Sequence, residues 1–216
     1  MNGLYQKINH YVYEIRMIEL DEYLYGMNRK KIGMEKAYDI IINSESNAVL
    51  NFWKGCFADP GFSFYKSSRV EKNQNRAKAF YRKAVDLDIE EMAEAGDKYA
   101  CTCLGEMYRI GHGVDQDYLR AVEWYCKAAE QGHAIAQYYL GVMYHYGRGV
   151  DKNHLIAVEW FRKAAEQGHS IAQRKLGLMY EYGYGDDKNK STAVEWYRKA
   201  AEQGDADAQR YLYCLT

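Results

Sequence analysis

Cysteine and histidine, the side chains that most often bind zinc, are few in this chain of 216 residues, which has five cysteines and six histidines. Cys101 and Cys103 flank one threonine, and two thiolates at this spacing could contact one zinc ion. A structural zinc site needs about four ligands, and no other cysteine or histidine stands where it would complete the set. We therefore predict no metal site, no cofactor and no catalytic residue.

Two further patterns that resemble functional motifs are better explained as helix ends. Gly147 and Gly149 form one of several Gly-x-Gly elements, but no β-strand is expected before them, as a nucleotide-binding loop requires. His133 and His169 occupy equivalent positions 36 residues apart, so we interpret them as variants of a helix N-cap rather than as ligands.

The charge balance argues against a dedicated nucleic-acid-binding protein. The chain has 29 basic and 30 acidic side chains, whereas such proteins usually carry a basic excess. Residues 66–83 hold seven basic side chains and one acidic one, and residues 86–94 then hold five acids and no base. We interpret both stretches as solvated surface. RNA binding by the basic stretch stays open as an alternative.

A repeat of 36 residues supplies the elements that would position any site. Three segments are nearly identical: AVEWYCKAAEQG at residues 121–132, AVEWFRKAAEQG at 157–168 and AVEWYRKAAEQG at 193–204. A second block of the form Leu-Gly-x-Met-Tyr precedes each of them in the same register. Two blocks in fixed register across three copies indicate a repeat architecture.

Each unit is predicted to form two antiparallel helices. On the first helix, Ala136, Leu140 and Tyr144 share one face, and Gly147 ends the helix. The second helix carries Trp160 on its alanine-bearing face. A lone helix pair cannot bury these apolar faces, so neighbouring pairs must stack. We therefore assign the recurring tyrosines and tryptophans to the core.

These two blocks resemble the Sel-one-like repeat (SLR) family, a relative of the tetratricopeptide repeat. The resemblance is specific over residues 97–204 and implies an all-α, right-handed superhelical α-solenoid of stacked antiparallel helix pairs. It also implies a scaffold or adaptor that binds another protein. Some secreted relatives have a disulfide in each repeat, but the cysteines here do not recur at one register, so we do not expect those disulfides.

The predicted organisation follows the repeat outward from its clear copies. We expect repeats at residues 97–132, 133–168 and 169–204, and a C-terminal capping helix at 205–216. Residues 48–96 are predicted to be a degenerate repeat with an extended loop and an inserted pair of helical turns after Ala84. Residues 1–47 are expected to form an N-terminal helical cap, and their first helix could instead bind a partner.

The residues that differ between repeats on the first helix are the candidate partner site. In a tetratricopeptide-like stack the first helices line the concave face, where these positions would provide a specific surface. The candidates are Thr102, Glu106, Arg109, Tyr138, Val142, His145, Arg174, Leu178 and Glu181. They could also be merely tolerant solvent positions.

The sequence therefore favours a protein-interaction scaffold in the cytoplasm. Charged residues interrupt the apolar ones in residues 1–25, so we expect no signal peptide, and no run of apolar residues is long enough to span a membrane. We expect a protein partner and no small-molecule substrate, and do not expect nucleic acid as a partner. A β-lactamase-like hydrolase, as described for some secreted relatives, is the alternative in the enzyme class.

Overall fold

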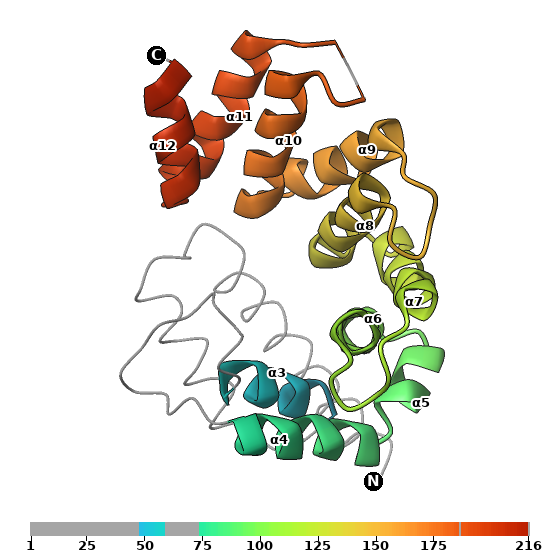
Figure 1. Ribbon diagram of the computed structural model, residues 1–216. Helices are drawn as coiled ribbons and strands as arrows, with labels where there is room; N and C mark the ends of the chain where they lie inside the picture. The colour runs from blue at the N-terminus through green and yellow to red at the C-terminus, as the bar shows by residue number, and fades with distance from the viewer. Residues whose placement is uncertain (1–47, 59–73, 186, 216) are drawn as a thin grey trace, which may run out of the picture.

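The computed structural model describes residues 48–58, 74–185 and 187–215, which form helices and short loops without a β-strand (Figure 1). The predicted cap at 1–47 and the extended loop of the degenerate repeat lie outside these residues. The helices are α3 (Ala48–Ala58), α4 (Gln74–Asp86), α5 (Ile89–Glu94), α6 (Lys98–Ile110), α7 (Tyr118–Glu130), α8 (Ala134–Tyr146), α9 (His154–Glu166), α10 (Ser170–Tyr182), α11 (Lys190–Glu202) and α12 (Ala206–Leu215).

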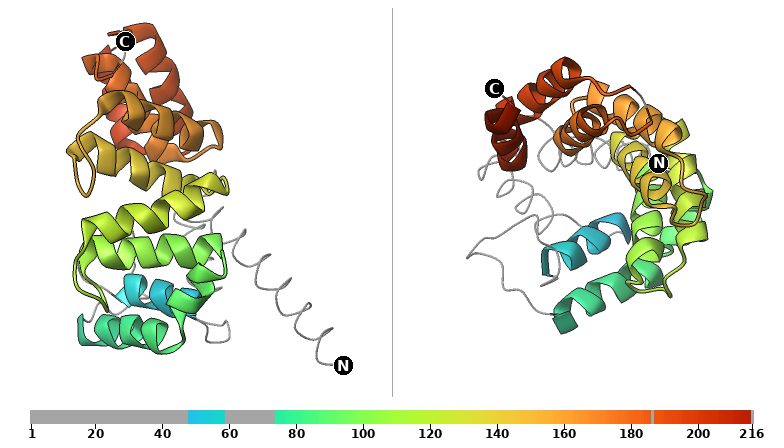
Figure 2. Two further views of the ribbon diagram at one scale, coloured as in Figure 1. Left: turned by 90° about the vertical axis from the view of Figure 1, so that its right-hand side faces the viewer. Right: turned by 45° about the horizontal axis from the view of Figure 1, so that its top comes forward.

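Consecutive helices pack in pairs, and the pairs follow one another around an arc. In Figure 1 the first helices of the pairs, α6, α8 and α10, lie toward the inner side of the arc, and α7, α9 and α11 lie outside them. The two views of Figure 2 show the same succession of stacked pairs. The predicted all-α solenoid of stacked helix pairs is confirmed.

The ends of the helices are set by short polar residues and by glycine. Asp97 accepts hydrogen bonds from the backbone nitrogens of Tyr99 and Ala100, both at 2.8 Å, and thereby caps α6. The first helices end at Gly111, Gly147 and Gly183, each with a positive φ between 67° and 75°. Asp117, Asn153 and Asn189 cap the second helices.

A second set of glycines allows the two helices of a pair to approach closely. A Cβ atom at Gly141 would lie 2.6 Å from the ring of Phe161, and Gly105 and Gly177 face Tyr125 and Tyr197 in the same way. The three rings are at most 1% exposed. The repeated Leu-Gly pair therefore makes room for one large aromatic ring per repeat.

The tryptophans are less uniformly buried than the sequence predicts. Trp124 is buried, but Trp160 and Trp196 are half-buried, and each packs against a hydrophobic cluster that includes the first helix of its own repeat. The ammonium groups of Lys127, Lys163 and Lys199 lie over the three indole rings, 3.7–4.1 Å from the ring centroids. Each lysine covers the outer side of its ring, as expected for a cation–π contact.

The predicted insertion after Ala84 forms a helix of its own. Asp88 has a φ of 57°, in the left-handed region, and separates α4 from the six-residue helix α5. Ala93 and Gly96 then occupy the positions that Ala129 and Gly132 hold at the end of α7. The second helix of the degenerate repeat is thus divided into two.

Candidate functional site

The predicted partner residues lie on α6, α8 and α10, but they are not open surface positions. Thr102 is buried, and the other eight are half-buried. Most of their side chains contact the next first helix or the second helix of their own pair, as the contacts below show. The view of these positions as freely exposed is therefore wrong, because the stacking of successive pairs covers one side of each first helix.

One equivalent position in each repeat contacts the N-cap of the next first helix. Thr102 Oγ1 lies 2.6 Å from His133 Nδ1. The ring of Tyr138 stacks on that of His169, with centroids 5.0 Å apart and an interplanar angle of 18°. Each pair has different chemistry but the same place in the stack and the same separation of 31 residues in sequence.

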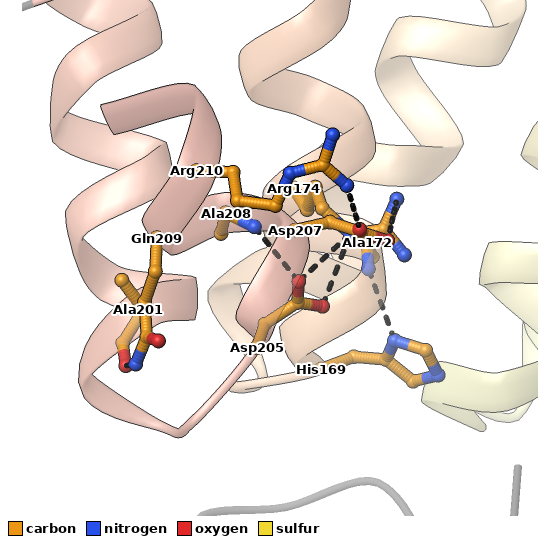
Figure 3. A network of polar contacts seen from close by, with 9 residues as sticks. All are labelled: His169, Ala172, Arg174, Ala201, Asp205, Asp207, Ala208, Gln209 and Arg210. Atoms are coloured by element: carbon orange, nitrogen blue, oxygen red, sulfur yellow. Dashed lines mark hydrogen bonds and ion pairs between the residues drawn. The ribbon is translucent and has the colours of Figure 1, made fainter. Parts of the chain in front are cut away.

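The third member of this series is an ion pair. Arg174 Nε lies 3.0 Å from the carboxylate of Asp205, as Figure 3 shows. The two side chains are 16% and 5% exposed, so the pair is largely shielded from water. Asp205 also accepts a hydrogen bond of 2.9 Å from the Ala208 nitrogen and so caps α12. A variable residue and a variable cap are therefore matched at each of these three interfaces.

A second group of candidates forms a polar cluster with tyrosines. The guanidinium of Arg109 donates two hydrogen bonds of 2.6 Å to Glu106. The hydroxyls of Tyr125 and Tyr139 donate to the same carboxylate, at 2.7 Å and 3.2 Å. Burial raises the pKa of Tyr125, so its hydroxyl keeps its proton.

An acid accepts from the tyrosine hydroxyl in the first and the last of the three repeats, although it stands at two different positions of the first helix. In the last repeat the Tyr197 hydroxyl donates a 2.6 Å hydrogen bond to Glu181. The middle repeat has Phe161 in place of the tyrosine, and its candidates there are Val142 and His145, neither of them acidic. Variation at these positions thus keeps a buried hydroxyl paired.

His145 belongs to an aromatic cluster at the loop edge of the array. Its ring lies 4.9 Å from that of His154 and 6.0 Å from that of Tyr184, measured between centroids. Burial, with smaller contributions from His154 and Lys175, lowers the pKa of His145 to about 4. Burial also lowers the pKa of His154. Both imidazoles are therefore neutral at pH 7.

This pair predicts acid sensitivity. Because the folded pKa of His145 is lower than its unfolded value, the unfolded chain binds more protons between pH 6.5 and about 4, and the histidine's contribution to stability is lost as pH falls through that window. We expect the Tm to fall between pH 7 and pH 5.5, and to fall less in His145→Gln. Equal pH dependence of both proteins in thermal melts would contradict this assignment.

Cys101 has a structural role that explains why it replaces glutamine. Gln137 and Gln173 each donate their side-chain amide to a carbonyl at the end of the preceding second helix, at 3.2 Å and 3.0 Å. The Cys101 thiol donates to the equivalent carbonyl, that of Ala93, at 3.3 Å. Burial raises its pKa to about 11. Among the described residues, no group of three metal-ligating side chains occurs.

The Gly-x-Gly elements are turns, and they also fasten each repeat to the one before. Their middle residues lie over a ring of the preceding second helix: the Arg148 guanidinium is 5.6 Å from the Tyr118 centroid, and the Tyr184 ring is 5.0 Å from that of His154. These contacts were not predicted from the sequence. The available signal was a ring at the first position of α7 and of α9, Tyr118 and His154.

No helix among the described residues has the length and apolar character needed to cross a membrane.

Comparison with known proteins agrees with the helical pairs described above. A search of functionally curated proteins finds no match. Among solved structures, a Sel1 repeat protein from Oxalobacter formigenes is 39% identical, with a TM-score of 0.56 over 60% of this chain and 98% of that one.

A second solved structure resembles a larger part of this chain. It is a protective antigen of uropathogenic Escherichia coli strains that displays an SLR fold, 33% identical with a TM-score of 0.56. The match covers 86% of this chain but 37% of the antigen. The model of the Sel1 repeat matches residues 61–89, 98–133, 134–169 and 170–205, so this chain belongs to the Sel1 repeat family.

Proposed function

We propose that this chain is a scaffold that binds a partner protein with the inner side of its arc, at α6, α8 and α10. Proteins with Sel1 repeats are generally protein-interaction scaffolds. The observation that carries the proposal is the fixed position of Arg109. Its guanidinium pairs with Glu106 and lies 5.3 Å from the centroid of the Tyr139 ring.

Arg109, held by Glu106 and Tyr139, suits binding because its side chain has little conformational entropy left to lose when a partner binds. Arginine and tyrosine are the side chains that most often dominate interfaces, and side chains already held in place lose less freedom on association. Tyr138 and Tyr139 are also half-buried neighbours, with ring centroids 5.2 Å apart.

The test compares two pairs of aliphatic residues changed to glutamate. Val142 and Leu178 are half-buried candidates on the first helices, whereas Leu119 and Leu155 are 60% and 63% exposed at the starts of α7 and α9. A partner captured with the intact chain is purified, and its affinity is measured for each double variant. We expect about tenfold weaker binding or more for V142E/L178E, and unchanged binding for L119E/L155E.

Two controls make the comparison decisive. Circular dichroism must show that both double variants remain helical, since a glutamate at a half-buried position destabilises the stack to some extent. Equal affinity of the two variants would remove the inner side as the binding surface.

The hydrolase alternative would need a catalytic motif such as the Ser-x-x-Lys of β-lactamases. The one Ser-x-x-Lys stretch in the sequence, from Ser63 to Lys66, lies outside the described residues.

A further inference from the structure

The loop between α6 and α7 sits in a different register from its two equivalents. Gly149 and Gly185, the second glycines of the later loops, lie against Tyr118 and His154, the first residues of α7 and α9. The equivalent Gly113 lies instead against Tyr81, seven residues beyond the start of α4. Seven residues are about two helical turns, so this loop crosses the middle of α4.

This shift accompanies a cavity between the loop and α4. The cavity has a volume of about 470 Å³, which falls within the range of small-molecule sites. Ala77, Lys78, Tyr81 and Arg82 line it from α4, and residues 111–115 line it from the loop. The ring of His112 lies 4.5 Å from that of Tyr81, between centroids, and holds the loop at that place.

Two positions on α4 depart in charge from the repeat pattern, and the first of them, Lys78, lines the cavity. Lys78 stands where the other second helices have Val122, Val158 and Val194, and Ala79 stands where they have Glu123, Glu159 and Glu195. At these two positions α4 has therefore gained a cation and lost an acid.

The basic side chains face the same space. Lys78 and Arg82 are four residues apart, so they lie on one face of α4, and both are exposed. The carboxylate of Asp115 is the one acidic group in the described lining. Two cations beside one acid leave an excess of positive charge along the described lining.

We propose that this cavity binds a small organic phosphate. Its phosphoryl group pairs with Lys78 and Arg82, because a phosphomonoester near pH 7 carries close to two negative charges and accepts several hydrogen bonds. The cavity is larger than a phosphate ion, so the organic part fills the remainder against His112 and Val114. Asp115 can accept a hydrogen bond from a hydroxyl group of that part.

The test titrates the full chain with inorganic phosphate, adenosine monophosphate and adenosine by calorimetry. K78V/A79E gives α4 the residues of the other second helices, and Arg82→Ala removes the second cation. Arg198→Ala is the matched control, because Arg198 holds the same position in α11 and is also exposed. We expect the first two variants to weaken nucleotide binding by about tenfold or more, and Arg198→Ala to leave it unchanged.

Each remaining outcome also decides the proposal. Equal affinity for adenosine and its monophosphate would overturn the role of the phosphoryl group. If neither inorganic phosphate nor adenosine monophosphate binds saturably, the proposal of a phosphate site in this cavity is wrong. A single-stranded oligoribonucleotide is titrated in parallel. If only this RNA binds, with a steep salt dependence, the cavity is part of a nucleic-acid surface and the small-molecule proposal is wrong. Sensitivity of nucleotide binding to the α4 variants, with helical content retained, supports it.

Discussion

Replacement of Gly149 by alanine is expected to lower the free energy of unfolding by about 3 kcal/mol or more. Gly149 has a φ of 71°, which disfavours any residue with a Cβ atom. A Cβ there would also lie 2.9 Å from the Leu119 nitrogen and closer still to the carbonyl oxygen of Tyr118. These are backbone atoms of the preceding repeat, so they cannot turn away as a side chain could.

Gly132 provides the control that separates the two effects. Its φ is 80°, but a Cβ there would meet nothing within 4 Å. Gly132→Ala should therefore lower the free energy of unfolding only by the cost of placing a Cβ atom at a positive φ, about 1–2 kcal/mol. Chemical denaturation of both variants measures the difference. Similar midpoints would show that the loop does not press on α7 and that the repeats are held together elsewhere.

Arg174→Ala is the second change for which we expect a large loss, about 3 kcal/mol. It leaves the carboxylate of Asp205, only 5% exposed, without its main cation. From the sequence alone, Arg174 was a candidate partner contact or a tolerant solvent position, and neither interpretation predicts such a loss. The stacked structure predicts it, because the arginine joins α10 to α12.

Two companion variants test that explanation. Arg210 occupies the equivalent position on α12, where its side chain is 81% exposed and lies 3.5 Å from Asp207. Arg210→Ala should change stability by less than about 0.5 kcal/mol. Asp205→Asn in the Arg174→Ala background should restore part of the loss, since asparagine still caps a helix without a buried charge. Failure of this rescue would indicate that the arginine acts through packing alone.

The sequence alone was sufficient to predict the helix pairs and their core, because the period of 36 residues places Leu140, Gly141 and Phe161 in the same pattern as their equivalents. It was not sufficient to predict the contacts of the candidate site. Positions 102, 138 and 174 meet partners 31 residues later, and that spacing appears only when one helix pair is stacked on the next. Opposite charges at Arg174 and Asp205 were the one available signal.

The proposed cavity shows a second limit of sequence reasoning. Lys78 and Ala79 could be recognised as departures from the repeat, but their meaning depends on which part of α4 the next loop covers. That register is fixed by Gly113 against Tyr81 and by the separate helix α5. Neither the place of the cavity nor its volume follows from the period of the repeat, because both arise where the period is broken.

The matched pairs between repeats also limit how such an array can change length during evolution. Loss of residues 133–168 would bring Thr102 opposite His169, which is again a threonine facing a histidine. Loss of residues 169–204 would instead place Tyr138 opposite Asp205 and leave that carboxylate without its arginine. Repeats of nearly identical sequence are thus not equally easy to delete. A deletion should persist in evolution only where the side chains brought together across the new junction form a compatible pair.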